Sequence, residues 1–249
     1  MDPSLIDGVI KKLRDEPLDT SVCDAFNHIF AHQPTVRVIN ASTAFFNWAD
    51  PFDPPRKDYR DDLIGYKVPD SIKDWLAKGL EESDKVLVLA AGNEGSDLSN
   101  TDYWRYEYIR SLLDDPRLQA RIVLASNIAV DPSGTETFNG YKISHRGNTF
   151  GELLYLQEVA LAAIGTDIGY GYNVHYSERD LSEKDRKLVI ETGTSLSAPI
   201  ISGYLTLLKQ KNPGLNMAQI VQLARANAIP VGDPAIYGRG VINTDILLS

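Results

Sequence analysis

The stretch that most constrains the fold is residues 193–199, Gly-Thr-Ser-Leu-Ser-Ala-Pro, which lies between two apolar runs. The run at 188–190 has the length of a strand end, and the run at 200–208 has helix length and no charged residue, which favours a buried helix. Pro199 is tolerated within the first turn of that helix, where its missing N–H has no intrahelical acceptor. This places Ser195 at or just before the helix N-terminus.

A serine in that position has two interpretations. Free backbone N–H groups and the positive end of the helix dipole point at it, which suits a developing oxyanion and makes Ser195 a candidate nucleophile. The alternative is an ordinary N-cap serine, which is the commoner meaning of an isolated Gly-Thr-Ser. The rest of the chain decides between them.

Four segments, in the right order, resemble the subtilisin-like serine peptidases (subtilases). Residues 193–199 with Gly203 resemble the nucleophile motif, and Val-Ile-Asn-Ala-Ser at 38–42 resembles the strand on one side of the substrate cleft. Val-Leu-Val-Leu-Ala-Ala-Gly-Asn-Glu-Gly at 86–95 resembles the other side, and Tyr-Gly-Arg-Gly-Val-Ile-Asn at 237–243 resembles the segment that closes the domain. The resemblance runs from about residue 21 to the C-terminus. It implies an α/β fold, a three-layer parallel sheet flanked by helices, truncated or degenerate at its N-terminus.

The same resemblance implies roles for particular residues. Ser195 is the expected nucleophile, and Asn93 together with the backbone N–H of Ser195 is expected to hold the oxyanion. An extended peptide would bind by adding a strand in a groove. The residues that resemble the lining of this groove are Ser42, Ala90, Ala91 and Gly92.

The motifs that carry the catalytic Asp and His of the family are not recognisable in this sequence. The family carries its Asp and a His-Gly motif before the strand that resembles 38–42, and here no His is followed by Gly. Ile-Asp-Gly-Val at 6–9 resembles the Asp motif with one residue deleted, which makes Asp7 a candidate orienter of a base. Residues 6, 10 and 13 also fit helical spacing, which is the commoner meaning of such a pattern.

The chain has four histidines as candidate bases: His28, His32, His145 and His175. His145 comes nearest, because Ile-Ser-His-Arg-Gly at 143–147 resembles the loop beside the leaving-group side of the family's cleft. A surface histidine is the alternative for each of them. We expect none to lie within hydrogen-bond reach of Ser195, so the chain alone should show little or no peptidase activity.

Three functions follow from these residues. The first is a serine endopeptidase whose base is rebuilt or is supplied by a segment outside this chain. The second is a pseudoprotease (a non-catalytic relative) that binds peptides or a protein partner in the retained cleft. The third is ester cleavage in the same cleft. The intact Ser195 and Asn93 favour chemistry, and the missing His motif favours binding.

Length and composition set the remaining limits. The 249 residues, 43% hydrophobic and 24% charged, fit one α/β domain spanning 1–249, with an atypical segment at 1–20 and loop insertions at 43–69 and 170–187. A net charge of −9 argues against nucleic acid or an anionic membrane as the main partner. The single cysteine excludes an internal disulfide. No signal peptide or membrane-length apolar run is visible, and the compartment stays open.

No cofactor is expected from the sequence. There is no metal-binding motif and no EF-hand type loop. Calcium sites are common in subtilases, but no such site is identifiable here.

Apolar periodicity predicts the secondary structure. We expect helices at 21–32, 70–82, 103–113 and 216–228, and strands at 36–40, 86–90 and 122–126. Helices that alternate with strands imply a parallel sheet, so these three strands should be neighbours, with Ser195 and Asn93 at the same edge.

Overall fold

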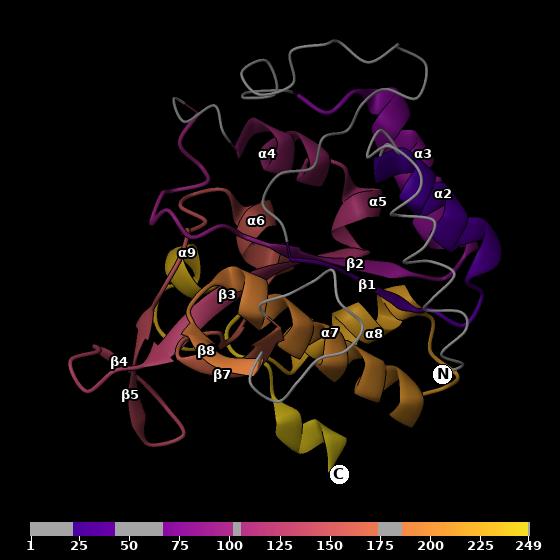
Figure 1. Ribbon diagram of the computed structural model, residues 1–249. Helices are drawn as coiled ribbons and strands as arrows, with labels where there is room; N and C mark the ends of the chain where they lie inside the picture. Colours follow the sequence, from indigo (N-terminus) through magenta and orange to yellow (C-terminus); the bar gives the residue numbers. More distant parts are fainter. Residues whose placement is uncertain (1–21, 43–66, 102–105, 174–185, 249) are drawn as a thin grey trace.

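A parallel sheet forms the centre of the structure (Figure 1). The computed structural model describes residues 22–42, 67–101, 106–173 and 186–248. Four parallel strands lie side by side in the order β1 (Val38–Ala41), β2 (Val86–Ala90), β3 (Ile122–Val130) and β6 (Ala160–Ile164). The predicted parallel neighbours are therefore confirmed, although β1 begins two residues later than expected.

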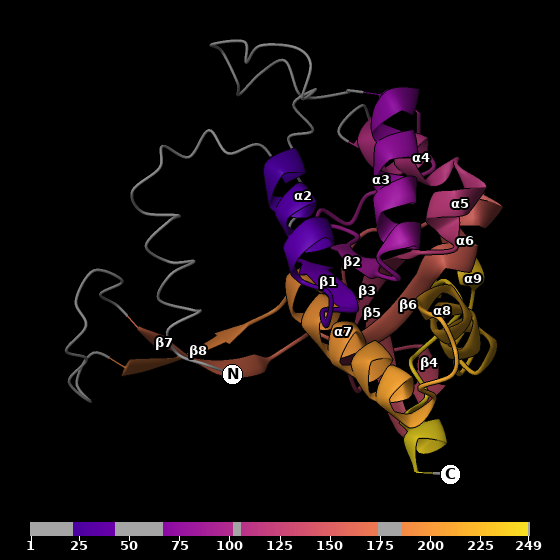
Figure 2. The same cartoon turned by 90° about the vertical axis from the view of Figure 1, so that its right-hand side faces the viewer.

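Helices cover both faces of this sheet, as the edge-on view in Figure 2 shows. Successive side chains of a strand point to opposite faces, so Leu87 and Leu89 pack in one buried cluster while Val86 and Val88 pack in another. On the first face lie α2 (Val22–His32), α3 (Asp70–Glu82), α4 (Glu107–Leu113), α5 (Pro116–Gln119) and α6 (Leu154–Val159). On the second lie α7 (Thr194–Lys211) and α8 (Met217–Ala226). This gives the expected three layers.

The predicted helices agree with the observed ones to within a few residues. The bounds of α3 match the prediction, and α2 begins one residue later than expected. Helix α8 begins after Asn216, whose side chain accepts from the Gln219 N–H while the Gln219 side chain accepts from the Asn216 N–H, a capping box. Residues 103–105 of the helix expected at 103–113 lie outside the described residues.

The segment at 143–147 corrects one expectation, because most of it is a strand and not a loop. Strand β5 (Tyr141–His145) pairs antiparallel with β3, with Ile128 opposite His145, and β4 (Glu136–Phe138) pairs with β5. β3 continues to Val130, four residues past the predicted end, and this extension provides the edge on which β5 forms.

Helix α7 corrects two further expectations. It begins at Thr194, so Pro199 lies in its second turn and not in its first. A proline there removes the N–H that the Ser195 carbonyl would otherwise accept. The helix is also not buried on every side: one face packs on the sheet, while Ile200 and Leu207 on the other side are 39% and 50% exposed.

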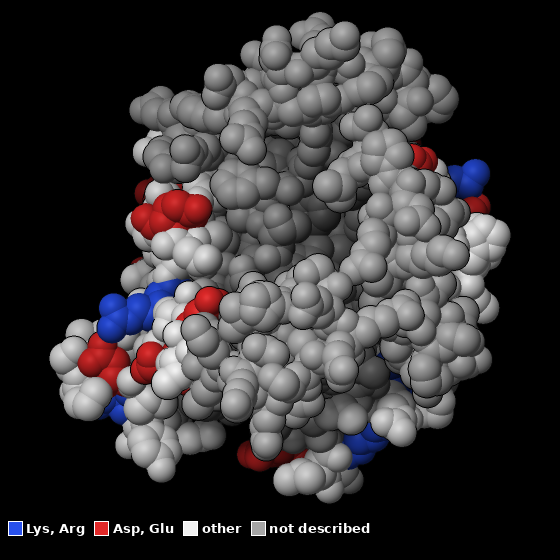
Figure 3. Space-filling view, in the orientation of Figure 1, with Lys and Arg blue, Asp and Glu red and all other residues white. Residues whose placement is uncertain are grey.

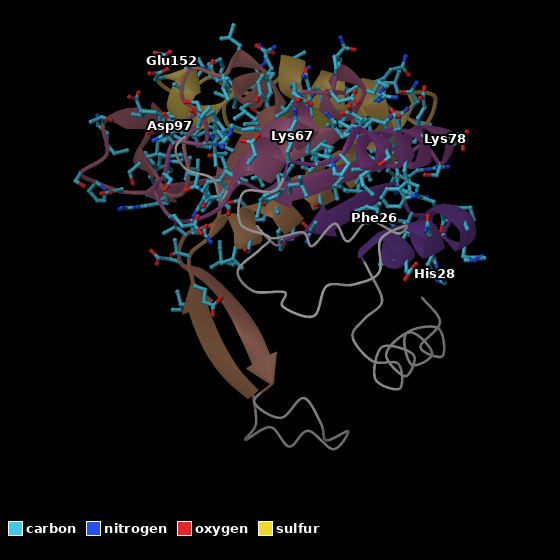
Figure 4. All side chains as sticks on the ribbon, turned by 90° about the horizontal axis from the view of Figure 1, so that it is seen from above. Phe26, His28, Lys67, Lys78, Asp97 and Glu152 are labelled. Atoms are coloured by element: carbon cyan, nitrogen blue, oxygen red, sulfur yellow. The ribbon has the colours of Figure 1, made fainter. Side chains whose placement is uncertain are left out.

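Two antiparallel strands, β7 (Ile168–Asn173) and β8 (Arg186–Glu191), form a ribbon that projects from the body in Figures 2 and 4. β8 ends two residues before Gly193 and leads directly into α7. The chain closes with α9 (Pro234–Tyr237) and the 3-10 helix η3 (Thr244–Leu247).

Charged side chains of the described residues lie toward the margins of the face in Figure 3. Their ion pairs include Arg117 with Asp74 at 2.6 Å and Arg239 with Glu158 at 3.2 Å, and in each of these both side chains are exposed. Exposed pairs contribute roughly 0–1 kcal/mol each. The buried apolar clusters, rather than these pairs, therefore hold the layers together.

Candidate active site

The start of α7 places Ser195 at the edge of the sheet. Gly193 precedes the helix in an extended conformation, and its N–H donates to the Gly165 carbonyl at 2.8 Å. Ser195 is the second residue of α7 and is half-buried. Its backbone N–H has no intrahelical acceptor, because the first turn of a helix leaves its N–H groups free. This N–H group and the helix dipole are suited to a negative oxygen.

Asn93 follows β2 and reaches this helix start. Its side-chain oxygen Oδ1 accepts from the Thr194 N–H at 2.8 Å and from the Thr194 Oγ1 at 3.0 Å. The backbone N–H of Gly92 donates to the same Thr194 hydroxyl at 3.1 Å. These bonds occupy Oδ1 and leave Nδ2, the donor end of the amide, on the other side. A Cβ placed on Gly193 would lie 3.2 Å from that Nδ2. The structure therefore brings Asn93 against Gly193 and Thr194, the two residues that precede Ser195.

Sequence reasoning missed three residues at this site: Thr194, Glu94 and Asn148. Thr194 ties the two segments together, and the other two brace the turn that carries Asn93. Burial by itself raises the pKa of the Glu94 carboxyl, but hydrogen bonds from Tyr106 and Asn148 outweigh it and leave that pKa below its ordinary value. The sequence does offer a signal for Glu94, because it directly follows Asn93. The position of Asn148 in the sequence gives no signal of the residues that it contacts.

His145 lies at the end of β5 with its ring held away from bulk water. A hydrogen bond of 3.0 Å joins its Nε2 to Oγ of the buried Ser126, and its ring packs edge-on against Tyr237 with 5.7 Å between centroids. Burial lowers the pKa of His145 to about 4. The ring is therefore neutral at pH 7, and its hydrogen bond goes to Ser126.

The low pKa of His145 predicts a loss of stability in mild acid. The unfolded ring titrates near 6.5 and the folded one near 4, so the unfolded chain binds the proton more readily between those values. The stability contributed by the neutral ring is present above pH 6.5 and is lost as the pH falls toward 4, by up to about 3 kcal/mol. Urea unfolding at pH 7 and pH 4.5 should show a smaller decrease for His145→Gln than for the parent chain. Equal decreases would contradict the burial of this ring.

The other candidate bases lie elsewhere. His28 and His32 lie next to each other on the exposed side of α2, with 5.0 Å between ring centroids and 48° between the ring planes, and Figure 4 shows His28 at the outer edge of that helix. Asp7 and His175 lie outside the described residues.

The residues expected to line the groove lie at or just after the ends of β1 and β2. Ser42 follows β1 and is half-buried, while Ala90, Ala91 and Gly92 at the end of β2 are buried. Parallel neighbours β1 and β2 therefore bring the two segments to the same edge of the sheet as Asn93.

Among the described residues, no three His, Cys, Asp or Glu side chains come together in a way that could hold a metal ion. No helix in this part of the chain has the length and apolar character needed to cross a bilayer.

Known proteins share this architecture. The model of the subtilase family matches residues 16–240. M-protease of Shouchella clausii (strain KSM-K16) is 36% identical over 53 residues, which make up 21% of this chain and 14% of that protein. The structure of the prenylagaramide maturation protease PagA aligns with a TM-score of 0.53 at 17% identity, covering 94% of this chain and 69% of that one. MycP3 protease from the type VII (ESX-3) secretion system aligns with a TM-score of 0.52 at 24% identity, covering 92% and 57%.

These matches differ in what they cover. The stretch aligned with M-protease spans about one seventh of that protein's length, and the solved structures show a shared fold. The family model, in contrast, extends over most of the chain and includes both Asn93 and Ser195. The chain therefore belongs to the subtilase family.

Proposed function

We propose that this chain carries the nucleophile and the oxyanion donors of a serine peptidase site that acts on peptides or proteins. The observation that carries the proposal is the pair of hydrogen bonds from Thr194 to Asn93 Oδ1, at 2.8 and 3.0 Å. They connect the turn after β2 to the helix start that presents Ser195. An amide donor and a serine hydroxyl beside one helix N-terminus are two of the three parts that acyl transfer needs.

The proposed chemistry follows from these positions. Ser195 Oγ attacks the carbonyl carbon of the bound substrate as its proton passes to a base or to water, and the carbonyl oxygen takes up the negative charge. Asn93 Nδ2 and the backbone N–H of Ser195 donate to that oxygen. These donors are already held in place, so little reorganisation is needed as the charge develops. Collapse of this intermediate breaks the bond to the leaving nitrogen or oxygen, and water then releases the acyl group from Ser195.

The part that the described residues do not supply is the base that takes the Ser195 proton. The hydrogen bond of His145 goes to Ser126, and His28 and His32 lie on the exposed side of α2. A serine hydroxyl without a base is a weak nucleophile at neutral pH. We therefore propose that this chain, by itself, hydrolyses peptides very slowly or not at all, and that full activity needs a base from outside the described residues.

One assay tests this function. An activated nitrophenyl ester has a leaving group that departs without being protonated, whereas an amide nitrogen must be protonated as it leaves. The parent chain should therefore hydrolyse the ester slowly but measurably and leave unfolded casein intact. The Ser195→Ala variant supplies the background rate. An ester rate equal to that background would contradict the proposal.

A second candidate function is a pseudoprotease that binds a peptide in the groove without cutting it. The hydrogen bond between His145 and Ser126 favours it, because it occupies one of the candidate bases. Chemical-shift mapping with an extended peptide should perturb Ser42 and Ala91 under both functions. A bound peptide that leaves both residues unperturbed would contradict the groove itself.

A further inference from the structure

Asn148 is a fully buried polar residue between β5 and α6. Its side-chain Nδ2 donates to the Ala91 carbonyl at 2.9 Å and to Glu94 Oε2 at 3.1 Å. Its Oδ1 accepts from the Ser96 N–H at 2.9 Å. These three partners bracket Asn93 on both sides, so a single side chain spans the whole turn that carries Asn93.

Two glycines make this close approach sterically accessible. Gly92 has φ +98°, and a Cβ on it would lie 2.2 Å from Asn148 Nδ2. Gly147 has φ +130°, and a Cβ on it would lie 2.9 Å from the Gly92 carbonyl oxygen. With no Cβ in either place, the backbone N–H of Asn148 also donates to that carbonyl at 3.1 Å.

Glu94 connects Asn148 to the peptide unit of Asn93. Its Oε2 accepts from the Asn93 N–H at 2.8 Å and from the Tyr106 hydroxyl, in addition to Asn148. The carboxylate is thus held from three directions. Any movement of the Asn148 amide would disturb the carboxylate that fixes the backbone of Asn93.

We propose that Asn148 is a positioning residue that holds the turn after β2 so that the Asn93 amide stays aligned with Thr194 and the start of α7. The inference rests on the proposed role of Asn93 as an oxyanion donor. Asn148 itself is buried and acts through the turn, not on the substrate. A donor that stabilises a developing charge must be fixed beforehand, and the residues behind it supply that fixation.

Amide hydrogen exchange of Thr194 tests this role without needing hydrolysis. The Thr194 N–H donates to Asn93 Oδ1 and has no bond to Asn148, so its protection reports on Asn93 alone. In Asn148→Ala we expect the Thr194 amide to exchange at least about tenfold faster, relative to the amide of Leu89 within β2. Asn148→Asp keeps the size of the side chain and the acceptor for Ser96, but loses both donors. It should show the same acceleration, which keeps the test available if the alanine variant does not fold.

The matched control is Ser111→Ala, which removes a buried hydrogen bond from the Val68 N–H, 2.8 Å long, on α4 and away from the site. It should leave the Thr194-to-Leu89 exchange ratio unchanged. Faster exchange at Ser96 with unchanged exchange at Thr194 in the folded variants would overturn the proposal, since Asn148 would then hold only its own partners. Where the parent turns over the ester, the Asn148 variants should lower kcat and leave KM unchanged. An inactive parent would contradict the proposed function, but the exchange result would still decide the role of Asn148.

Discussion

Replacing Asn93 with alanine should slow ester hydrolysis by this chain about 10²–10³-fold in kcat, with KM unchanged. The amide would donate to the substrate oxygen only when that oxygen carries charge, so its removal acts on the transition state and not on binding. The magnitude is that known for the oxyanion asparagine of subtilisin, and it is the effect expected of Asn93 in its proposed role. Oxyanion donors can supply roughly 10³–10⁴-fold over water without a triad, so the change should remove most of the residual rate.

The control for this substitution is Asn212→Ala. Asn212 caps the far end of α7, where its Nδ2 donates to the Leu208 carbonyl at 2.9 Å. This change also removes one asparagine side chain, but at the far end of α7 from Ser195, and it should change kcat by less than about twofold. Unfolding measurements on both variants show whether the lost bonds to Thr194 also lower stability. Equal rates of ester hydrolysis for Asn93→Ala and Asn212→Ala would show that Asn93 does not contribute to the reaction.

The second large effect is the contrast between Ser195→Ala and His145→Ala. Ser195→Ala should reduce ester hydrolysis to the level of the buffer alone. His145→Ala should leave the rate within about twofold of the parent at pH 7.5, because the ring is hydrogen-bonded to Ser126 and acts on neither Ser195 nor Asn93. Robust casein cleavage that both substitutions abolish would show that His145 is the base after all. Cleavage abolished by Ser195→Ala alone would point to another histidine or to a lysine.

The arrangement of β1, β2 and β3 was predictable because their sequences carry direct signals. Buried parallel strands are nearly continuous apolar runs, and their carboxyl ends meet at one edge. Asn93 follows one such run, whereas Ser195 follows β8, an antiparallel strand of the projecting ribbon, and was placed by its position at a helix start. Local pattern and connection rules were therefore enough to bring the two residues toward the same place.

The parts that could not be predicted depend on contacts distant in sequence. The bonds of Asn148 reach residues more than fifty positions away, and an asparagine after a glycine reads as an ordinary turn. The exposed side of α7, at Ile200 and Leu207, depends on which elements cover the helix, and an uncharged sequence cannot reveal that. Pro199 was placed in the first turn because the helix start was taken too late.

The proposed site centres on Ser195 as a nucleophile held beside an oxyanion donor, with no base identified for it among the described residues. A fluorophosphonate tests it directly, because its phosphorus forms a bond to a serine Oγ as fluoride leaves and the oxygen on phosphorus takes up charge. Mass spectrometry of the digested chain should find slow modification confined to the peptide that contains Ser195, and slower still in Asn93→Ala. Modification at a different serine, or fast modification of Ser195 that His145→Ala abolishes, would contradict the account.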